Sequence, residues 1–305
     1  MKSLELPPPR DEFEMVMDDG VPIVARIHGN ARGTRLFFSH GNGFAADGYL
    51  PFWGVLLERF EVVVFDFRNH GRNGPSPAES HDYAHFIADL ASVRRQVTSR
   101  LGARTSVGVF HSMSARAAMK EAVDTGFHWD ALVLFEPANV PLRGHALYTM
   151  MVTFENKLVE LAGRRRRRYD DPGELAREYA ANRFHRRWVE GAHELMARAV
   201  LRREEDTGAW VLACRPQLEA AIYGEAMELD LWPAYGDYGG PVKLIGADAQ
   251  MDGASASAVA NRALASESDY VYEAIAGTGH LLQIEKPEAC IGAMTSFLED
   301  LGIAV

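Results

Sequence analysis

The stretch Ser106-Val-Gly-Val-Phe-His-Ser-Met-Ser114 decides the fold, because it joins an apolar run to a helix through one exposed serine. The run Ser106–Phe110 is typical of a strand buried on both faces of a parallel sheet. Apolar residues at helical spacing begin at Met113, so Ser112 occupies a tight strand-to-helix turn. A serine in such a turn exposes its Oγ at the sheet edge, and the next backbone N–H points to the same side. The stretch therefore predicts a nucleophile at the carboxyl end of a central strand.

Similar apolar runs recur on both sides of this stretch and alternate with helical segments. We expect parallel strands at 35–38, 62–65, 106–110, 131–135, 242–245 and 270–275. We expect helices, from apolar residues at every third or fourth position, at 49–59, 83–101, 113–126, 256–265 and 287–301. Near the N-terminus, alternation around Asp18-Asp19-Gly20 predicts an antiparallel hairpin exposed on one face. A hairpin followed by repeated β-α-β units indicates an α/β protein with a mostly parallel sheet.

The regular alternation of strands and helices breaks after Pro137. From about Leu142 to Tyr235 no convincing strand is visible, and apolar residues recur at helical spacing. We interpret 142–235 as a helical cap of about 94 residues, inserted into a core formed by 1–141 and 236–305. The cap holds 15 basic and 15 acidic residues, so the net charge of −10 lies in the core.

Five consecutive arginines, Arg164–Arg168, lie within this cap. A run of like charges is expected to be a solvated helix face. A sharper interpretation is a basic rim that steers an anionic substrate across the acidic core.

Composition narrows the class of protein. The 305 residues are 47% hydrophobic and 24% charged, which excludes disordered, collagen-like and coiled-coil chains. The negative net charge argues against a nucleic-acid-binding protein. Cys214 and Cys290 lie in no close Cys/His cluster, so we expect buried thiols instead of a disulfide framework or a zinc ribbon. Met1–Arg10 lacks the apolar segment of a secretion signal, and no run of 18 apolar residues occurs. We therefore expect a cytoplasmic protein without a membrane partner.

The serine turn carries a specific resemblance. Phe110-His-Ser-Met-Ser114 is similar to the nucleophile elbow of the α/β-hydrolase fold superfamily, Gly-x-Ser-x-Gly, whose inner residues are often His-Ser-Met. This chain has Phe110 and Ser114 where the pattern has glycines. Ser114 is a mild change, but the ring of Phe110 must point away from the helix, or the turn must open slightly.

A second loop extends the resemblance to an oxyanion hole. Ser39-His-Gly-Asn-Gly-Phe44 follows the strand at 35–38, where the superfamily carries a His-Gly loop. The residue after that His-Gly pair commonly supplies one oxyanion N–H, and the residue after the nucleophile supplies the other. The resemblance therefore implies that the N–H groups of Asn42 and Met113 bind the oxyanion.

The resemblance also implies a base and an orienting acid. Gly277-Thr-Gly-His280 follows the last strand and is similar to the superfamily's Gly-x-Gly-His loop, which makes His280 the base. Asp248 follows the strand at 242–245 and completes the superfamily order Ser112, Asp248, His280, so we expect it to orient the imidazole. Other carboxylates remain open for this role: Asp252 in the same loop, and Asp130 and Glu136 near the preceding strand.

Other polar motifs are expected to be structural. Asp66–Asn73 is similar to the superfamily's Asp-x-Arg-Gly-His-Gly-x-Ser segment, which fastens a loop, so His70 is not expected to be catalytic. His111 is expected to pack or hydrogen-bond behind the elbow. The aromatic residues of the cap are expected to form its own core, with one or two lining a pocket: Trp188, Trp210, Trp232 and Tyr223.

The resemblance covers nearly the whole chain and implies an eight-stranded α/β-hydrolase core with a helical cap. It implies a serine hydrolase that cleaves an ester or lactone bond of a small organic substrate through an acyl-enzyme, with no metal or organic cofactor. A carbon–carbon bond hydrolase of the meta-cleavage type is the alternative within the hydrolases. A non-catalytic ligand-binding protein and a cofactorless oxygenase are alternatives on the same scaffold. Substrate-binding residues and the oligomeric state are left open.

Overall fold

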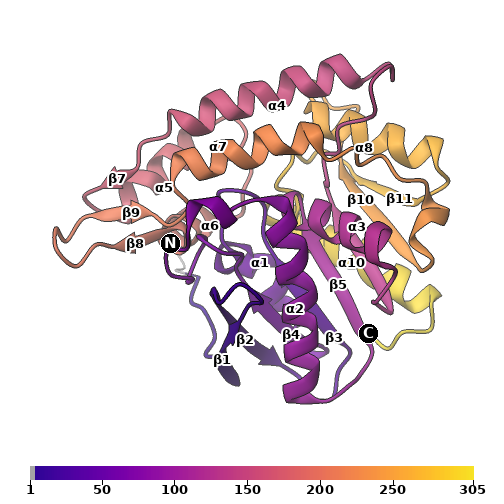
Figure 1. Ribbon diagram of the computed structural model, residues 1–305, viewed down its shortest axis with the longest axis horizontal. Coiled ribbons are helices and arrows are strands. Elements are labelled where there is room, and N and C mark those ends of the chain that lie inside the picture. The colour runs from indigo at the N-terminus through magenta and orange to yellow at the C-terminus, as the bar shows by residue number, and fades with distance from the viewer. Residues whose placement is uncertain (1–3) are drawn as a thin grey trace.

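The computed structural model describes residues 4–305 and contains an eight-stranded sheet in the order β1-β2-β4-β3-β5-β6-β10-β11 (Figure 1). The strands are β1 (Asp11–Val16), β2 (Pro22–Gly29), β3 (Arg35–Ser39), β4 (Glu61–Phe65), β5 (Ser106–His111), β6 (Ala131–Phe135), β10 (Val242–Ala247) and β11 (Val271–Ile275). The pairs β1–β2 and β2–β4 are antiparallel, and the other pairs are parallel. The predicted hairpin and mostly parallel sheet are confirmed. Met1–Ser3, part of the stretch predicted to carry no secretion signal, lie outside the described residues.

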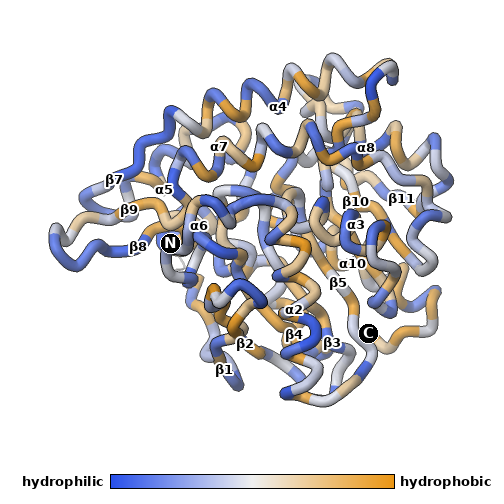
Figure 2. Tube along the Cα trace, in the orientation of Figure 1, coloured by the Kyte–Doolittle hydropathy of each residue, from blue (hydrophilic) through white to orange (hydrophobic). Residues whose placement is uncertain are grey.

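The central strands are buried on both faces because their side chains alternate between two apolar layers. In β4, Val62 and Val64 contact one layer, whereas Val63 and Phe65 contact the other. The first layer is covered by α1 (Leu50–Trp53), α9 (Leu282–Glu285) and α10 (Pro287–Asp300). The second is covered by α2 (Tyr83–Leu101), α3 (Met113–Thr125) and α8 (Ala256–Glu267). Figure 2 shows apolar residues concentrated along these strands and polar residues on the outer turns of the helices.

The segment between β6 and β10 lies over the carboxyl ends of the parallel strands, with α4 and α7 side by side along the top of the molecule (Figure 1). Its elements are α4 (Tyr148–Gly163), β7 (Arg168–Tyr169), α5 (Pro172–Ala181), α6 (Ala192–Val200), β8 (Leu201–Arg203), β9 (Trp210–Leu212) and α7 (Pro216–Glu225). The expectation that this segment holds no strand is wrong, because β7, β9 and β8 form a small antiparallel sheet. These strands of two or three residues are too short for alternation to be visible in the sequence. None of the helices described in residues 4–305 has the length and apolar character needed to cross a membrane.

The unusual Phe110 of the elbow is accommodated inside the second apolar layer. Its ring is fully buried and packs edge-on against Trp129, with 5.6 Å between the ring centroids. Gly108 lies two residues earlier on the same face of β5, and a Cβ added there would come within 2.6 Å of both the Phe110 ring and Cδ2 of Leu132. The missing side chain of Gly108 therefore provides the space into which the Phe110 ring folds, away from the turn itself.

We predict that Gly108→Ala destabilises the fold by about 1–3 kcal/mol, because the added methyl overpacks the space that the Phe110 ring fills. In a Phe110→Ala background the same change should cost less, since the opposing ring is gone. Urea unfolding of the two single variants and the double variant measures this coupling. Gly224→Ala in α7 is the matched control, because nothing lies within 4 Å of its added Cβ. Equal costs of Gly108→Ala in both backgrounds would contradict the packing argument.

Candidate active site

Ser112 lies in the turn between β5 and α3 with a strained backbone. Its φ of 53° and ψ of −112° fall in a region that L-residues rarely adopt. The conformation is held by its own N–H, which donates to the carbonyl of Phe135 at 2.9 Å. Ser114 closes the turn with its hydroxyl, which bonds both the N–H and the carbonyl of His111. The Ser112 side chain is thereby fixed at the carboxyl edge of the sheet, as the sequence predicts for the elbow.

His280 reaches Ser112 from the loop after β11. Its Nε2 lies 3.0 Å from the Oγ of Ser112, and its Nδ1 lies 3.2 Å from Oε2 of Glu136. The loop is held by Glu285, whose carboxylate accepts a hydrogen bond from the N–H of Gly279 at 2.9 Å. Arg187 of the cap pairs with the same carboxylate, so a cap residue lies beside the histidine loop. The structure brings together a hydroxyl, an imidazole and a carboxylate in one hydrogen-bonded row.

The carboxylate of Glu136 is completely buried at the end of β6. Its backbone has a φ of 46°, which turns the side chain across the ends of the neighbouring elements. Oε1 accepts hydrogen bonds from the N–H of Ala247 at 2.7 Å and from Asn261 Nδ2 at 3.0 Å. Oε2 accepts from the hydroxyl of Ser257 at 2.9 Å and faces His280. Buried carboxylate oxygens need hydrogen-bond donors, and here the three donors belong to three different residues, Ala247, Asn261 and Ser257.

Asp248 does not contact His280, which corrects the expectation that it orients the imidazole. Its Oδ2 accepts from the N–H of Gly277 at 2.8 Å, and its Oδ1 accepts from the N–H of Gln250 at 2.9 Å. These backbone donors hold the pKa of Asp248 below its ordinary value. Asp248 therefore joins two loops. The physical reason is that an acidic residue follows both β6 and β10, and the side chain of Glu136 already occupies the space beside Nδ1 of His280.

The other two carboxylates named from the sequence are also away from the histidine. Asp130 lies before β6, at the opposite end of the strand, where it accepts from the N–H of Ser106 at 2.7 Å. Asp252 is exposed in the loop after β10. Glu136, the remaining alternative, is the only one of the four that the described residues place in hydrogen-bond contact with His280.

The loop expected to supply an oxyanion N–H approaches the elbow closely. A Cβ added to Gly41 would lie 2.9 Å from Nδ1 of His111 and 3.2 Å from Cβ of Ser112, so the missing side chain allows the loop to approach the elbow this closely. Asn42 follows, and its side-chain Nδ2 donates to the carbonyl of Glu219 in α7 at 2.8 Å. Met113 begins α3 directly after Ser112, where the first N–H groups of a helix have no partner within the helix. Both N–H groups named from the sequence thus belong to segments that flank Ser112, and their role in catalysis stays a prediction.

His111 connects the two loops behind the elbow, which confirms its expected structural position. Its Nε2–H donates to the carbonyl of His280 at 2.8 Å, while its Nδ1 accepts from the hydroxyl of Tyr49 at 2.8 Å. The Tyr49 oxygen in turn accepts from the N–H of Gly41 at 3.3 Å. Burial, together with the neighbouring His280, lowers the pKa of His111 well below its ordinary value. His111 therefore stays neutral and joins the glycine loop to the histidine loop.

The segment Asp66–Asn73 fastens loops, as its resemblance implied. Asp66 accepts from the N–H groups of Ala46 and Arg72, at 2.8 and 3.1 Å. His70 is buried, and its Nε2 accepts from the N–H of Gly43 at 3.2 Å. Burial lowers the pKa of His70 well below its ordinary value, so it too is neutral. The motif holds the glycine loop and takes no part in the row formed by Ser112, His280 and Glu136.

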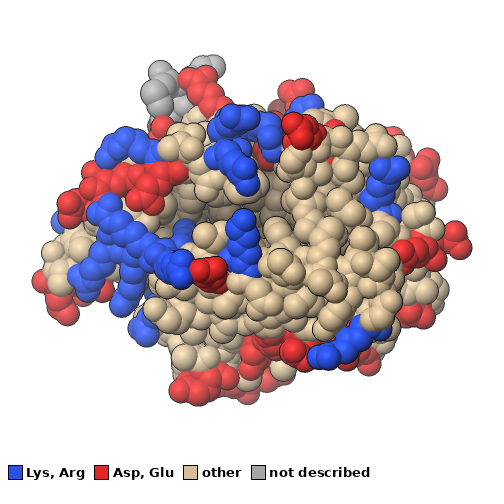
Figure 3. All heavy atoms as spheres, turned by 90° about the horizontal axis from the view of Figure 1, so that it is seen from above, with Lys and Arg blue, Asp and Glu red and all other residues tan. Residues whose placement is uncertain are grey.

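The arginine run is neither a simple solvated helix face nor an unpaired basic rim. It follows α4 and enters β7, and each of its five members has a carboxylate within 4.0 Å: Glu160 for Arg164, Glu219 for Arg165, Glu174 for Arg166, and Glu204 for Arg167 and Arg168. In Figure 3, basic and acidic side chains accordingly gather together on the left of the cap-side face. The pairing inside the cap weakens the idea that this run steers an anionic substrate.

Trp188 and its neighbours form an aromatic cluster where the cap meets the glycine loop. The indole of Trp188 packs against Phe44, Tyr179 and His185, with ring centroids 4.7–6.2 Å apart. Trp210 and Trp232 are partly buried against the two apolar layers of the core. The aromatic residues of the cap therefore attach it to the core, in addition to packing within it.

Three potential metal ligands, His70, His81 and Cys214, have atoms within 4.8 Å of one another. The hydrogen bonds around them do not suit a metal. Asn69 donates from Nδ2 to Nδ1 of His81, which leaves Nε2 carrying the hydrogen instead of a lone pair. The Nε2 lone pair of His70 is already used by Gly43. Burial raises the pKa of Cys214 well above its ordinary value, which favours the thiol over the thiolate that binds metals.

Comparisons with known proteins agree with this geometry. Residues 36–293 match the model of the alpha/beta hydrolase family. The solved structure of E-2-(acetamidomethylene)succinate hydrolase has a TM-score of 0.73 at 18% identity, over 95% of this chain and 99% of that one. An esterase from Exiguobacterium antarcticum gives 0.68 at 16% identity, over 94% and 98%. An esterase from Rhodococcus sp. ECU1013 gives 0.65 at 19% identity, over 95% and 99%. At these identities the structures share the fold.

We predict that His81 makes the protein sensitive to acid. Burial, aided by the charge of Arg68, lowers the pKa of His81 to about 4. The unfolded chain binds this proton near pH 6.5, whereas the folded chain does not until about pH 4. The free energy of unfolding should therefore fall as pH drops through this window, by up to about 1.4 kcal/mol per pH unit from this one residue.

Urea unfolding at several pH values measures this slope. His81→Gln should flatten it by up to one proton, because glutamine can still accept from Asn69 but does not titrate. His128→Gln, at an exposed histidine, is the control for losing a histidine. An unchanged slope in His81→Gln would contradict the prediction.

Proposed function

Because the chain belongs to the alpha/beta hydrolase family, we propose that it is a serine hydrolase that cleaves an ester or lactone bond of a small organic substrate. In this proposal Ser112 is the nucleophile, His280 the general base and Glu136 the carboxylate that orients it. The observation that carries the proposal is the 3.0 Å separation between Ser112 Oγ and His280 Nε2, with a carboxylate on the other ring nitrogen.

The proposed first step transfers one proton and forms one bond. His280 Nε2 takes the proton of Ser112 as Oγ attacks the substrate carbonyl carbon. The Nδ1–H of His280 donates to Glu136, which fixes the tautomer that leaves Nε2 free to accept. The charged carboxylate then stabilises the imidazolium that forms.

The negative charge that develops on the carbonyl oxygen requires donors that are already in place. We assign these to the N–H groups of Asn42 and Met113, which flank Ser112 in the glycine loop and at the start of α3. The positive end of the α3 dipole adds to this stabilisation. The C–O bond of the ester then breaks, and the leaving oxygen takes the proton from His280. A water molecule, deprotonated by His280, hydrolyses the acyl-enzyme and restores Ser112.

Ester or lactone substrates are favoured over carbon–carbon bonds by the chemistry of the proposed site. A serine, a histidine and an oxyanion hole suffice for acyl transfer from an alkoxide leaving group. Two of the similar structures named above are esterases.

We predict that a fluorophosphonate probe labels Ser112 in the folded protein, because the hydrogen bond to His280 activates the hydroxyl. Mass spectrometry of the digested protein locates the label. Ser112→Ala should remove it, and His280→Ala should slow it strongly. Ser99→Ala, at an exposed serine of α2, is the control, because it removes a hydroxyl that lies outside the elbow. An unlabelled wild-type protein would refute the proposal and favour the ligand-binding alternative.

We predict that Glu136→Gln lowers kcat for a p-nitrophenyl ester by about 10²–10⁴-fold, because the amide no longer stabilises the imidazolium or fixes its tautomer. Asp248→Asn is the control that separates the two carboxylates. It should lower thermal stability by weakening the Gly277 and Gln250 hydrogen bonds while retaining most of kcat. The opposite pattern of kcat losses would restore Asp248 as the orienting acid.

A further inference from the structure

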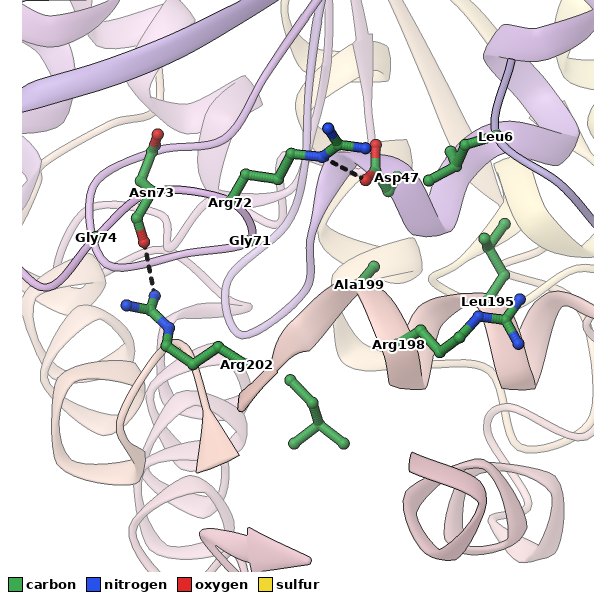
Figure 4. Close-up of a pocket in the computed structure, with 11 residues that line it drawn as sticks. Leu6, Asp47, Gly71, Arg72, Asn73, Gly74, Leu195, Arg198, Ala199 and Arg202 are labelled. Atoms are coloured by element: carbon green, nitrogen blue, oxygen red, sulfur yellow. Dashed lines mark hydrogen bonds and ion pairs between the residues drawn. The ribbon is translucent and has the colours of Figure 1, made fainter. Parts of the chain in front are cut away.

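A cleft of about 510 Å³ lies along the junction between cap and core, away from the residues that contact Ser112. The core wall is formed by Leu6, Asp47 and the loop Gly71–Gly74, and the cap wall by residues of α6 and β8. Figure 4 shows Arg72 on the core wall, above, and Arg198 and Arg202 on the cap wall, below. The cleft is large enough for a small molecule, and three guanidinium groups line it.

The side chains that line this cleft carry more positive than negative charge. Asp47 is the only acidic residue in its lining, and that carboxylate is already paired with both Arg26 and Arg72. Arg198 and Arg202 form no ion pair with any carboxylate of the described chain, residues 4–305. This contrasts with the arginine run 164–168, where every member is paired. Two cap arginines thus face the cleft with their charge uncompensated.

The core wall is rigid. The side chain of Asn73 bonds three backbone groups, donating to the carbonyls of Asp66 and Phe67 at 2.6 and 3.2 Å and accepting from the N–H of Val24 at 3.0 Å. Asp66 accepts from the N–H of Arg72 at 3.1 Å. A loop held at these points presents its groups without further ordering, which lowers the entropic cost of binding a ligand.

The cap wall carries an incompletely bonded guanidinium. Arg202 donates from Nη2 to the carbonyl of Asn73 at 2.7 Å, whereas its Nε is buried without a partner. The adjoining helix α6 packs tightly on the core, since a Cβ added to Gly48 would lie 2.3 Å from the Met196 side chain. Arg202 is therefore held at the junction between cap and core, and its Nε–H has no acceptor. A buried donor without an acceptor is costly unless a ligand supplies one.

We propose that this cleft is a second binding site, separate from the catalytic row, for a small molecule that carries a phosphate or carboxylate group. Arg198 and Arg202 supply the forked donors that such groups accept. Arg72, although paired with Asp47 and Glu12, offers a further N–H donor from the core wall. Because the anion contacts both walls, its binding holds the cap against the core. Binding at this site does not depend on the proposed hydrolysis, so it can be tested independently of the roles assigned to Ser112, His280 and Glu136.

Isothermal titration calorimetry with inorganic phosphate, and separately with succinate, tests the proposal on the whole chain. We expect saturable millimolar or tighter binding of at least one probe, weakening as sodium chloride rises. Arg202→Gln should weaken it by about tenfold or more through the loss of charge-assisted hydrogen bonds. Arg203→Gln is the matched control. This neighbour is exposed, outside the cleft, and bonds only the carbonyl of Gly208 at 3.4 Å.

A second variant guards against a folding defect in Arg202→Gln, which also loses the bond to Asn73. Arg198 is exposed, so Arg198→Gln should fold normally and still weaken the binding of the probe. Tighter binding of phosphate than of succinate identifies a phosphate ligand, and the reverse identifies a carboxylate. Absence of saturable binding for both probes, or equal losses in Arg203→Gln and Arg198→Gln, would overturn the proposal.

Discussion

The buried carboxylate of Glu136 is the constraint on which the arrangement of the site depends. Taking an ionised carboxylate out of water costs several kcal/mol unless donors surround it. Here the donors come from the backbone of β10, from two side chains of α8 and from the histidine loop. The sheet edge, one flanking helix and the loop after β11 must therefore all be in place before Glu136 is satisfied. The stability of this corner of the fold and the orientation of His280 are consequences of the same hydrogen bonds.

The histidine loop is held from the other side by neutral groups. His111 and Tyr49 connect the carbonyl of His280 to the N–H of Gly41, so a chain of hydrogen bonds joins the glycine loop to the histidine loop. Burial lowers the pKa of His111 well below its ordinary value, which keeps its Nδ1 available to accept from Tyr49 at neutral pH. A charged His111 would have no acceptor for that second proton. Burial thus keeps His111 neutral, so the hydrogen bonds from Gly41 through Tyr49 and His111 to His280 have one direction. The same burial lowers the free energy of unfolding in acid, where histidine takes up a proton.

The sequence predicted the core closely because its strands are continuous apolar runs and its helices are long; 83–101 and 131–135 coincide with α2 and β6. The expected helix at 49–59 is instead the short α1 with a 3₁₀ segment on each side, Ala46–Tyr49 and Gly54–Glu58. Glu136 and Asp248 both follow parallel strands, so the sequence alone could not tell which carboxylate lies against His280; the structure places Glu136 there, with a φ of 46°. The pattern Phe135-Glu136-Pro137 after a buried strand is the signal that could have favoured it. The pairs Arg165–Glu219 and Arg168–Glu204 join residues far apart in the chain, so spacing could not reveal them.

The cap is positioned over the site by polar contacts as well as apolar ones. Arg116, one turn into the elbow helix α3, forms a buried ion pair with Glu155 of α4. A buried pair adds little net stability compared with apolar residues of similar volume, but breaking it leaves an uncompensated charge that costs about 3–5 kcal/mol. Alternative placements of α4 would separate Arg116 from Glu155 and incur that cost. We infer that the pair acts mainly to specify where α4 sits relative to α3, the helix that begins after Ser112.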